Sequence, residues 1–224
     1  MPAGTITALR AQATDPQRVN VFINDEFAIG VSLNTISKEK LYVGKLLSEE
    51  DYACIARAEG VDKALRVAAR FLEMRPRSVA EIRERLQRKA FDPETIDAAL
   101  ARLSELGLVD DSSFARFWVE NRQAHRPRGT GALRDELRRK GIDRTVVETI
   151  LGDDELTGDE HERARLLART ALPRYASVAD RATFARRMGG YLQRRGFSYD
   201  IVRPIVDQLW AEAQGSAGTA DDAP

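Results

Sequence analysis

A six-residue segment that recurs three times constrains the fold of this chain more than any other feature. Residues 86–91 read LQRKAF, residues 137–142 read LRRKGI and residues 192–197 read LQRRGF. Successive copies are spaced by 51 and 55 residues. Periods of this length are typical of arrays in which each supersecondary unit buries its apolar face against its neighbours. The recurrence therefore predicts a repeat protein with an extended surface for large partners.

Each copy has the pattern of a helix that ends and turns into another helix. Gly141 and Gly196 are suited to the left-handed conformation that closes a helix, and the apolar residue after each would fold back on the last turn. Basic residues in that turn favour the negative end of the helix dipole. Ala90 replaces glycine in the first copy, so we expect a slightly different turn there. A residue suited to start the next helix follows each copy, at Asp92, Asp143 and Ser198.

Helical periodicity dominates the chain after its first 47 residues. We expect Ser48 to begin a helix that Gly60 ends, and a second helix over 62–74. Ser78 and Glu81 have the spacing of a capping box at the start of the next helix. Further helices follow at each copy of the repeated segment, and an acidic stretch over 153–160 is interpreted as a linker between modules.

The first residues have the alternation of strands instead. The segments 5–9, 18–23 and 27–31 are rich in β-branched residues, and 24–26 has the composition of a tight hairpin. They predict a three-stranded antiparallel meander. Because so small a sheet is not stable alone, it should pack on the helices that follow.

The fold class is therefore mainly α, with tandem three-helix repeats that form an elongated curved array behind a small N-terminal antiparallel β-meander. The expected segments are 1–47 for the β-meander extension, 48–109 for the first repeat with its lead-in helix, 110–152 for the second repeat, 153–214 for the third repeat and 215–224 for a disordered tail.

Composition excludes several classes of function. Cys54 is the only cysteine, which rules out an internal disulfide, and we interpret it as a core residue on a helix face. We expect a cytoplasmic protein with no membrane partner, because the sequence has no signal-peptide pattern and no apolar run of about 20 residues. The absence of sustained heptads favours a monomer.

No constellation of residues indicates catalysis, a metal or a cofactor. His125 and His161 lie in polar stretches without metal spacing, and no phosphate-binding loop is present. The pair Asp110 and Asp111 is better explained as a helix cap than as a metal site. We therefore predict a binding protein and not an enzyme.

Basic residues near the ends of the modules are the candidate binding groups. Residues 62–152 carry 19 basic and 15 acidic side chains, although the whole chain is neutral. Arginine suits carboxylate or phosphate partners. The alternative is a solvated face whose cations pair with Glu81, Glu84 and Glu136. The candidates are Arg75, Arg77, Arg83, Arg88, Lys89, Arg122, Arg126, Arg128, Arg138, Arg139, Lys140, Arg194 and Arg195.

The chain resembles the RecX family of bacterial regulators. The resemblance is carried by RPRS at 75–78, LGLVDDSSFA at 106–115, WVENR at 118–122 and the stretch 136–142. It runs from about residue 64 to 151 and more weakly to 210. It implies tandem three-helix repeats that lie in the groove of the RecA recombinase filament on DNA, and inhibition of ATP hydrolysis, strand exchange and coprotease activity.

Two functions follow as hypotheses. The resemblance implies a partner, the RecA filament, and regulation of DNA repair and the SOS response. The alternative is a stand-alone DNA-binding protein, because three-helix units with basic corners can dock on DNA. Direct contact with single- or double-stranded DNA is compatible with both.

Overall fold

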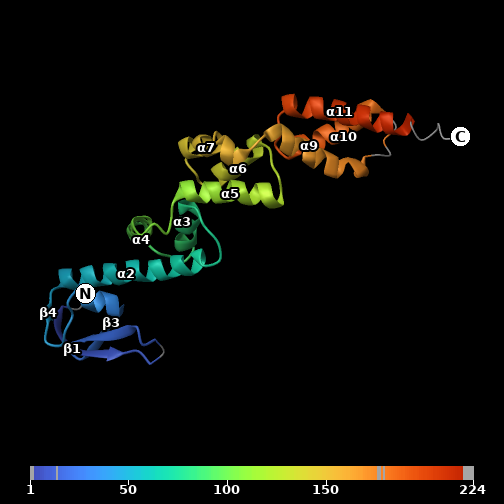
Figure 1. Cartoon of the computed structure of the whole chain (residues 1–224). Helices are drawn as coiled ribbons and strands as arrows, with labels where there is room; N and C mark the ends of the chain where they lie inside the picture. Colours follow the sequence, from blue (N-terminus) through green and yellow to red (C-terminus); the bar gives the residue numbers. More distant parts are fainter. Residues whose placement is uncertain (1–2, 14, 176–177, 179, 219–224) are drawn as a thin grey trace. The chain divides into compact units, whose positions relative to one another are not determined.

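The computed structural model describes residues 3–13, 15–175, 178 and 180–218 of the chain, the side chains only as far as residue 213 (Figure 1). The chain divides into two compact units, Met1–Val109 and Asp110–Pro224. No described helix is both long enough and apolar enough to cross a bilayer.

The first unit begins with an antiparallel sheet. Its strands are β1 (Gly4–Ala11), β2 (Arg18–Ile23), β3 (Glu26–Ser32) and β4 (Leu46–Leu47), in the order β3-β2-β1-β4. The predicted meander is confirmed for β1 to β3, but the prediction of three strands was wrong. The short α1 (Leu33–Lys38) brings the chain back so that β4 pairs with β1.

The hairpin between β2 and β3 has the conformation that its sequence favours. Asn24 and Asp25 have φ angles of 50° and 66°, and Ile23 pairs with Glu26 across the turn. A two-residue hairpin turn requires such positive φ angles, which asparagine and aspartate tolerate. Val19 and Val21 are buried while their neighbours are partly exposed, which gives the sheet one apolar face.

A single buried carboxylate joins this sheet to the long helix α2 (Glu49–Leu72). Glu59 is 1% exposed and accepts hydrogen bonds from Arg18 Nη1 at 2.7 Å and from the Ser32 backbone N–H at 2.9 Å. Arg66 adds a contact of 3.2 Å. A buried charge needs such partners, and they fix the sheet on the helix beside it (Figure 1).

Helix α2 corrects two expectations. Gly60 does not end a helix, because α2 continues through it to Leu72. A glycine inside a helix costs only about 1 kcal/mol relative to alanine, and packing of Ala64 and Ala68 in the core offsets that cost. Cys54 is exposed, so the prediction of a core residue was wrong. The next residue, Ile55, is the one that packs in the core of the sheet.

The first repeat packs α3 (Val79–Gln87) and α4 (Pro93–Glu105) on the second half of α2. The predicted capping box of Ser78 and Glu81 is confirmed, and Asp92 caps α4. The core is formed by Ile82, Leu86 and Leu103, together with further aliphatic residues of the three helices.

The second repeat consists of α5 (Asp111–His125), α6 (Thr130–Arg139) and α7 (Arg144–Leu151). The acidic stretch after it is not only a linker. It forms the short helix α8 (Asp154–Thr157), and Leu156 packs on the core of this repeat. Gln123 Nε2 donates to the carbonyls of Leu156 and Thr157 at 2.9 and 3.0 Å, which fixes α8 to α5.

The third repeat contains α9 (Glu160–Ala171), the 3-10 turn Leu172–Arg174, α10 (Arg181–Arg194) and α11 (Tyr199–Gly218). Its core centres on Phe184, Met188 and Leu192. The expected disordered tail from residue 215 was wrong for 215–218, which belong to α11. Residues 219–224 lie outside the described part of the chain.

The three predicted corners are confirmed and share one backbone geometry. Ala90, Gly141 and Gly196 have φ angles of 59°, 78° and 88°. In each corner the next N–H donates back to the carbonyl of the repeated leucine, at 3.3, 3.2 and 3.3 Å. The left-handed residue donates to the carbonyl three positions before it, at 2.9, 2.9 and 2.8 Å. These two bonds define the Schellman motif. Ala90 adopts the same turn as the glycines, so the expectation of a different first corner was wrong.

Replacing the left-handed alanine should stabilise the protein. The left-handed conformation costs a non-glycine residue about 1 kcal/mol, so Ala90→Gly should raise the free energy of unfolding by about that amount. Urea denaturation measures the change. Gly107, with φ of 65° and no atom within 4 Å of the place where a Cβ would lie, is the matched control. Gly107→Ala should lower stability by about as much. A destabilised Ala90→Gly variant would contradict the strain argument.

Helix caps should make stability sensitive to acid. The Ser113 backbone N–H and hydroxyl lower the pKa of Asp110 below its ordinary value of 3.8. A lowered pKa in the folded state contributes stability above the unfolded value, and this contribution is lost as the pH falls through the folded value. Asp110→Asn keeps a capping oxygen but does not titrate.

We expect the stability difference between the wild type and Asp110→Asn to shrink as the pH falls below about 4. Thermal melts of both proteins between neutral and acidic pH measure it. Parallel pH profiles would show that the Asp110 carboxylate contributes nothing as a charged cap.

Candidate macromolecule-binding surface

The basic residues of the first repeat are largely engaged within the protein. Arg75 donates to both carboxylate oxygens of Glu81, at 3.2 and 2.8 Å. The guanidinium of Arg77 lies 3.8 Å above the Phe71 ring, and burial lowers its pKa. Arg75 therefore ties the connection between α2 and α3 to α3, and Arg77 ties it to the end of α2, so both cations are engaged within the protein.

The other first-repeat candidates differ in their exposure. Arg83 pairs with Asp97 at 2.6 Å across α3 and α4, and Arg88 pairs with Glu84 at 3.7 Å along one helix. Lys89 is exposed and has no carboxylate within salt-bridge distance in the described part of the chain. Glu84 thus pairs as the solvated-face alternative expects, whereas Glu81 is half-buried and bonds an arginine that precedes its helix.

In the second repeat, one glutamate contacts several of the predicted residues. Glu136 Oε2 accepts from Trp118 Nε1 at 2.9 Å and from Arg122 Nε at 2.7 Å, while Arg128 Nε lies 3.5 Å from Oε1. Arg122 and Lys140 both lie over the Trp118 ring, at 4.6 and 4.9 Å from its centroid. Arg122 is therefore a structural cation that orients the aromatic ring.

The remaining cations of α6 lie on its outer side. Arg138 is 3.7 Å from Glu148, and Arg139 Nε donates to the backbone carbonyl of Asp135 at 3.2 Å. Both arginines are exposed. Pairs of this kind are weak in solvent, so Arg138 and Arg139 can exchange their contacts for those of a partner.

Two glycines bring the second and third repeats into direct contact. The N–H of Gly129 donates to the carbonyl of Arg195 at 2.9 Å. A Cβ atom on Gly129 would lie 2.3 Å from the Gly196 carbonyl oxygen, and one on Gly196 would lie 2.3 Å from Ala132 Cβ. Glu160 accepts hydrogen bonds from the N–H and hydroxyl of Thr130. The third corner is thus seated against the start of α6.

This contact creates a groove of about 740 Å³ with a basic lining. Arg126 and Arg128 from the loop after α5 line it together with Arg163 of α9 and Arg195 of the third corner. The described lining residues include His125 but no aspartate or glutamate. The candidate Arg194 precedes Arg195 and is exposed, but it does not line this groove. We call this surface the junction groove.

Arg163 was missed by the sequence analysis. Its Nη1 donates to the Gly158 carbonyl at 3.1 Å, whereas Nε and Nη2 are buried without a hydrogen-bond partner. Burial lowers the pKa of this guanidinium, although Glu160 and Asp159 act in the opposite direction. No sequence signal could have found it, because Arg163 stands among glutamates like any residue of a solvated helix face.

The arrangement suits binding of anionic groups. Arginine presents a planar set of donors that matches carboxylate and phosphate oxygens. The capping interpretation of Asp110 is confirmed, since its carboxylate accepts from the Ser113 N–H at 2.7 Å. Among the described residues no group of three or more histidine, cysteine, aspartate or glutamate side chains is placed to hold a metal.

Comparison with known proteins assigns the N-terminal sheet and each of the three helical repeats. Residues 4–48 match the model of the regulatory protein RecX N-terminal domain. Residues 64–103, 110–151 and 159–206 match the first, second and third three-helix domains of RecX. A regulatory protein RecX from Lactobacillus delbrueckii is 31% identical over 93% of this chain and 76% of its own length. The chain belongs to the RecX family.

Other members of the RecX family agree with this assignment. The regulatory protein RecX of Mycobacterium avium is 36% identical over 65% of this chain and 83% of its own length. A crystal structure of regulatory protein RecX has a TM-score of 0.75 at 25% identity, over 92% of this chain and all of that one. RecX from Lactobacillus salivarius has a TM-score of 0.59 at 26% identity, over 68% of this chain and 97% of that one.

Proposed function

We propose that this protein binds the RecA filament on DNA and inhibits its ATP hydrolysis, strand exchange and coprotease activity. It acts in the cytoplasm as a monomer, by binding and not by catalysis. Two facts support this function. The relatives are named regulatory proteins of the RecX family, and the junction groove offers four arginines with no acidic residue in its described lining.

The junction groove is the part of the candidate surface most suited to a partner. Arg126 lines the groove, is exposed and has no salt-bridge partner in the described ranges. Arg128 and Arg195 also line it and are held by protein contacts, Arg128 by Glu136 and the Arg194 carbonyl and Arg195 by the Tyr191 ring. A partner with acidic or phosphate groups would therefore meet one unpaired cation together with cations that the protein already holds in place.

The stand-alone DNA-binding alternative receives less support from the first two repeats. A helix–turn–helix unit docks on DNA through the N-terminal part of its last helix. In α4 that part carries the exposed Glu94 and Asp97, which would repel phosphate. In α7 it begins with the exposed Arg144, and Glu148 one turn later already pairs with Arg134. The charge argument against DNA therefore applies most directly to the first repeat.

An ATP-turnover assay tests the proposal. Adding the protein to RecA, single-stranded DNA and ATP should lower the rate of ATP hydrolysis. The variant Arg126→Glu should need about fivefold more protein for the same inhibition, because an unpaired cation of the groove lining becomes repulsive. Arg126 is exposed, so the fold should persist.

Arg70→Glu is the matched control, since Arg70 is exposed on α2 and lies outside the junction groove. It should inhibit like the wild type. Unchanged ATP turnover at several-fold molar excess of the wild-type protein would contradict the proposed function. Inhibition by Arg126→Glu equal to that by the wild type would contradict the role of the junction groove.

A further inference from the structure

The third repeat lacks an ion pair that the other two repeats share. Arg83 on α3 pairs with Asp97 on α4 at 2.6 Å, and Arg134 on α6 pairs with Glu148 on α7 at 2.8 Å. In both repeats the arginine stands three residues before the buried leucine of the corner, and the carboxylate stands eleven residues after it. Each pair links the second helix of its repeat to the third.

At the equivalent positions the third repeat has Gly189 and Arg203, counted from Leu192. The equivalence is supported by the core, because Met188 and Val202 are buried like Ile82 and Ile96 in the first repeat. Gly189 therefore has no side chain where the other repeats have an arginine, and Arg203 has a positive charge where they have a carboxylate.

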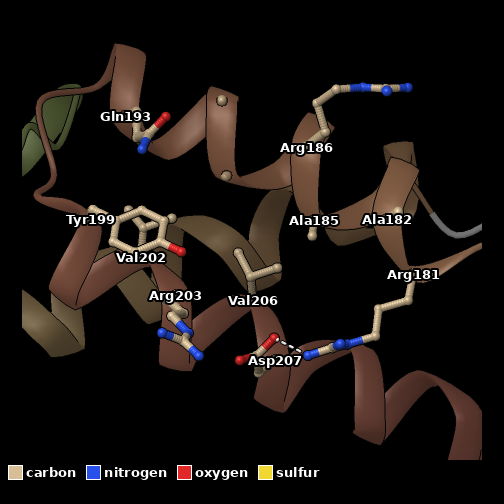
Figure 2. A pocket seen from close by; sticks show the side chains of 12 residues that line it. Arg181, Ala182, Ala185, Arg186, Gln193, Tyr199, Val202, Arg203, Val206 and Asp207 are labelled. Carbon is tan, nitrogen blue, oxygen red and sulfur yellow. Dashed lines mark hydrogen bonds and ion pairs between the residues drawn. The ribbon is translucent and has the colours of Figure 1, made fainter.

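An open groove occupies the place of the missing pair. It has a volume of about 720 Å³ and lies between α10 and α11, with Gly189 in its lining. Val202 and Val206 of α11 also line it (Figure 2). Gly189 has room for a side chain, since the nearest atom to a Cβ there would be Val202 Cγ1 at 3.7 Å. We call it the α10–α11 groove.

The charge of this groove is positive and partly uncompensated. Arg181, Arg186 and Arg203 line it, with Asp207 as the acidic member of the described lining. Asp207 accepts from Arg181 Nη2 at 2.8 Å, as Figure 2 shows. Arg203 is exposed and has no ion pair among the described residues, although Asp207 stands one helical turn after it.

An exposed aromatic ring stands next to the free cation. Tyr199 is 60% exposed and lines the same groove. It precedes Arg203 by four residues, so the two side chains are neighbours on one face of α11. The first two repeats have Pro93 and Arg144 at this position. The start of the helix therefore does not require an aromatic residue, and the exposed ring needs another explanation.

We propose that the α10–α11 groove binds single-stranded nucleic acid, with a backbone phosphate at Arg203 and a base stacked on Tyr199. Proteins that bind single strands combine a cationic groove with aromatic rings on which bases stack. An acidic peptide would use the cations but not the ring, and a duplex would not offer an unstacked base. The proposal does not depend on filament binding, because it concerns the protein and a nucleic-acid strand alone.

Fluorescence anisotropy of a labelled thymidine oligonucleotide, with the full chain and no recombinase, tests this proposal. The double variant Gly189→Arg with Arg203→Glu rebuilds the ion pair of the other repeats and fills the groove. We expect its affinity to fall about tenfold or more. Tyr199→Ala should weaken binding about fivefold. Arg203→Ala should lower the salt dependence of binding by about one phosphate contact.

Arg70→Ala is the control for the net charge change of minus one in the rebuilt-pair variant, and it should bind like the wild type. Arg203 and Tyr199 are exposed, so their single variants test the groove even if the double variant does not fold. Affinities of Tyr199→Ala and Arg203→Ala within twofold of the wild type would overturn the proposal. So would equal competition by polyglutamate and by unlabelled oligonucleotide.

Discussion

The left-handed residue at the end of the second helix of each repeat is the feature on which the rest of the structure depends. Ala90, Gly141 and Gly196 each reverse the chain so that the next apolar residue returns to the core. Ile142 and Phe197 are buried there, at 4% and 3% exposure. The third corner has a second role, because Gly196 also contacts the start of α6. One backbone conformation thus closes a repeat and docks it on its neighbour.

The same corners determine where positive charge accumulates. Basic residues in the last turn of a helix are favoured by the helix dipole, and the corner then carries them to the edge of the repeat. Arg195 reaches the junction groove in this way, while α5 supplies Arg126 and Arg128 through the following loop. Many other arginines pair within the fold, so the cations left for a partner are fewer than the composition suggests.

Sequence signals correctly predicted the elements whose geometry depends only on residues close by in the sequence. The corners, the capping box at Ser78 and the hairpin at Asn24 all follow from residue type at fixed spacing. The sequence predictions were wrong where tertiary packing determines the extent of a helix. Helix α2 continues through Gly60 because residues after it are buried in a core, and α8 forms because Leu156 packs on a core. The expected domain boundaries and the partner surface stay predictions, and Arg163 enters that surface only through the fold.

In the proposed complex, the junction groove faces the recombinase when the protein binds the filament. Site-specific photocross-linking can detect this contact, with a photoreactive residue at position 126 and, for comparison, at position 116. Arg116 is exposed, pairs with Asp153 and lies outside the groove. We expect strong cross-links to RecA subunits of the filament from position 126 and weak cross-links from position 116. Equal yields at the two positions, or none at 126, would contradict it.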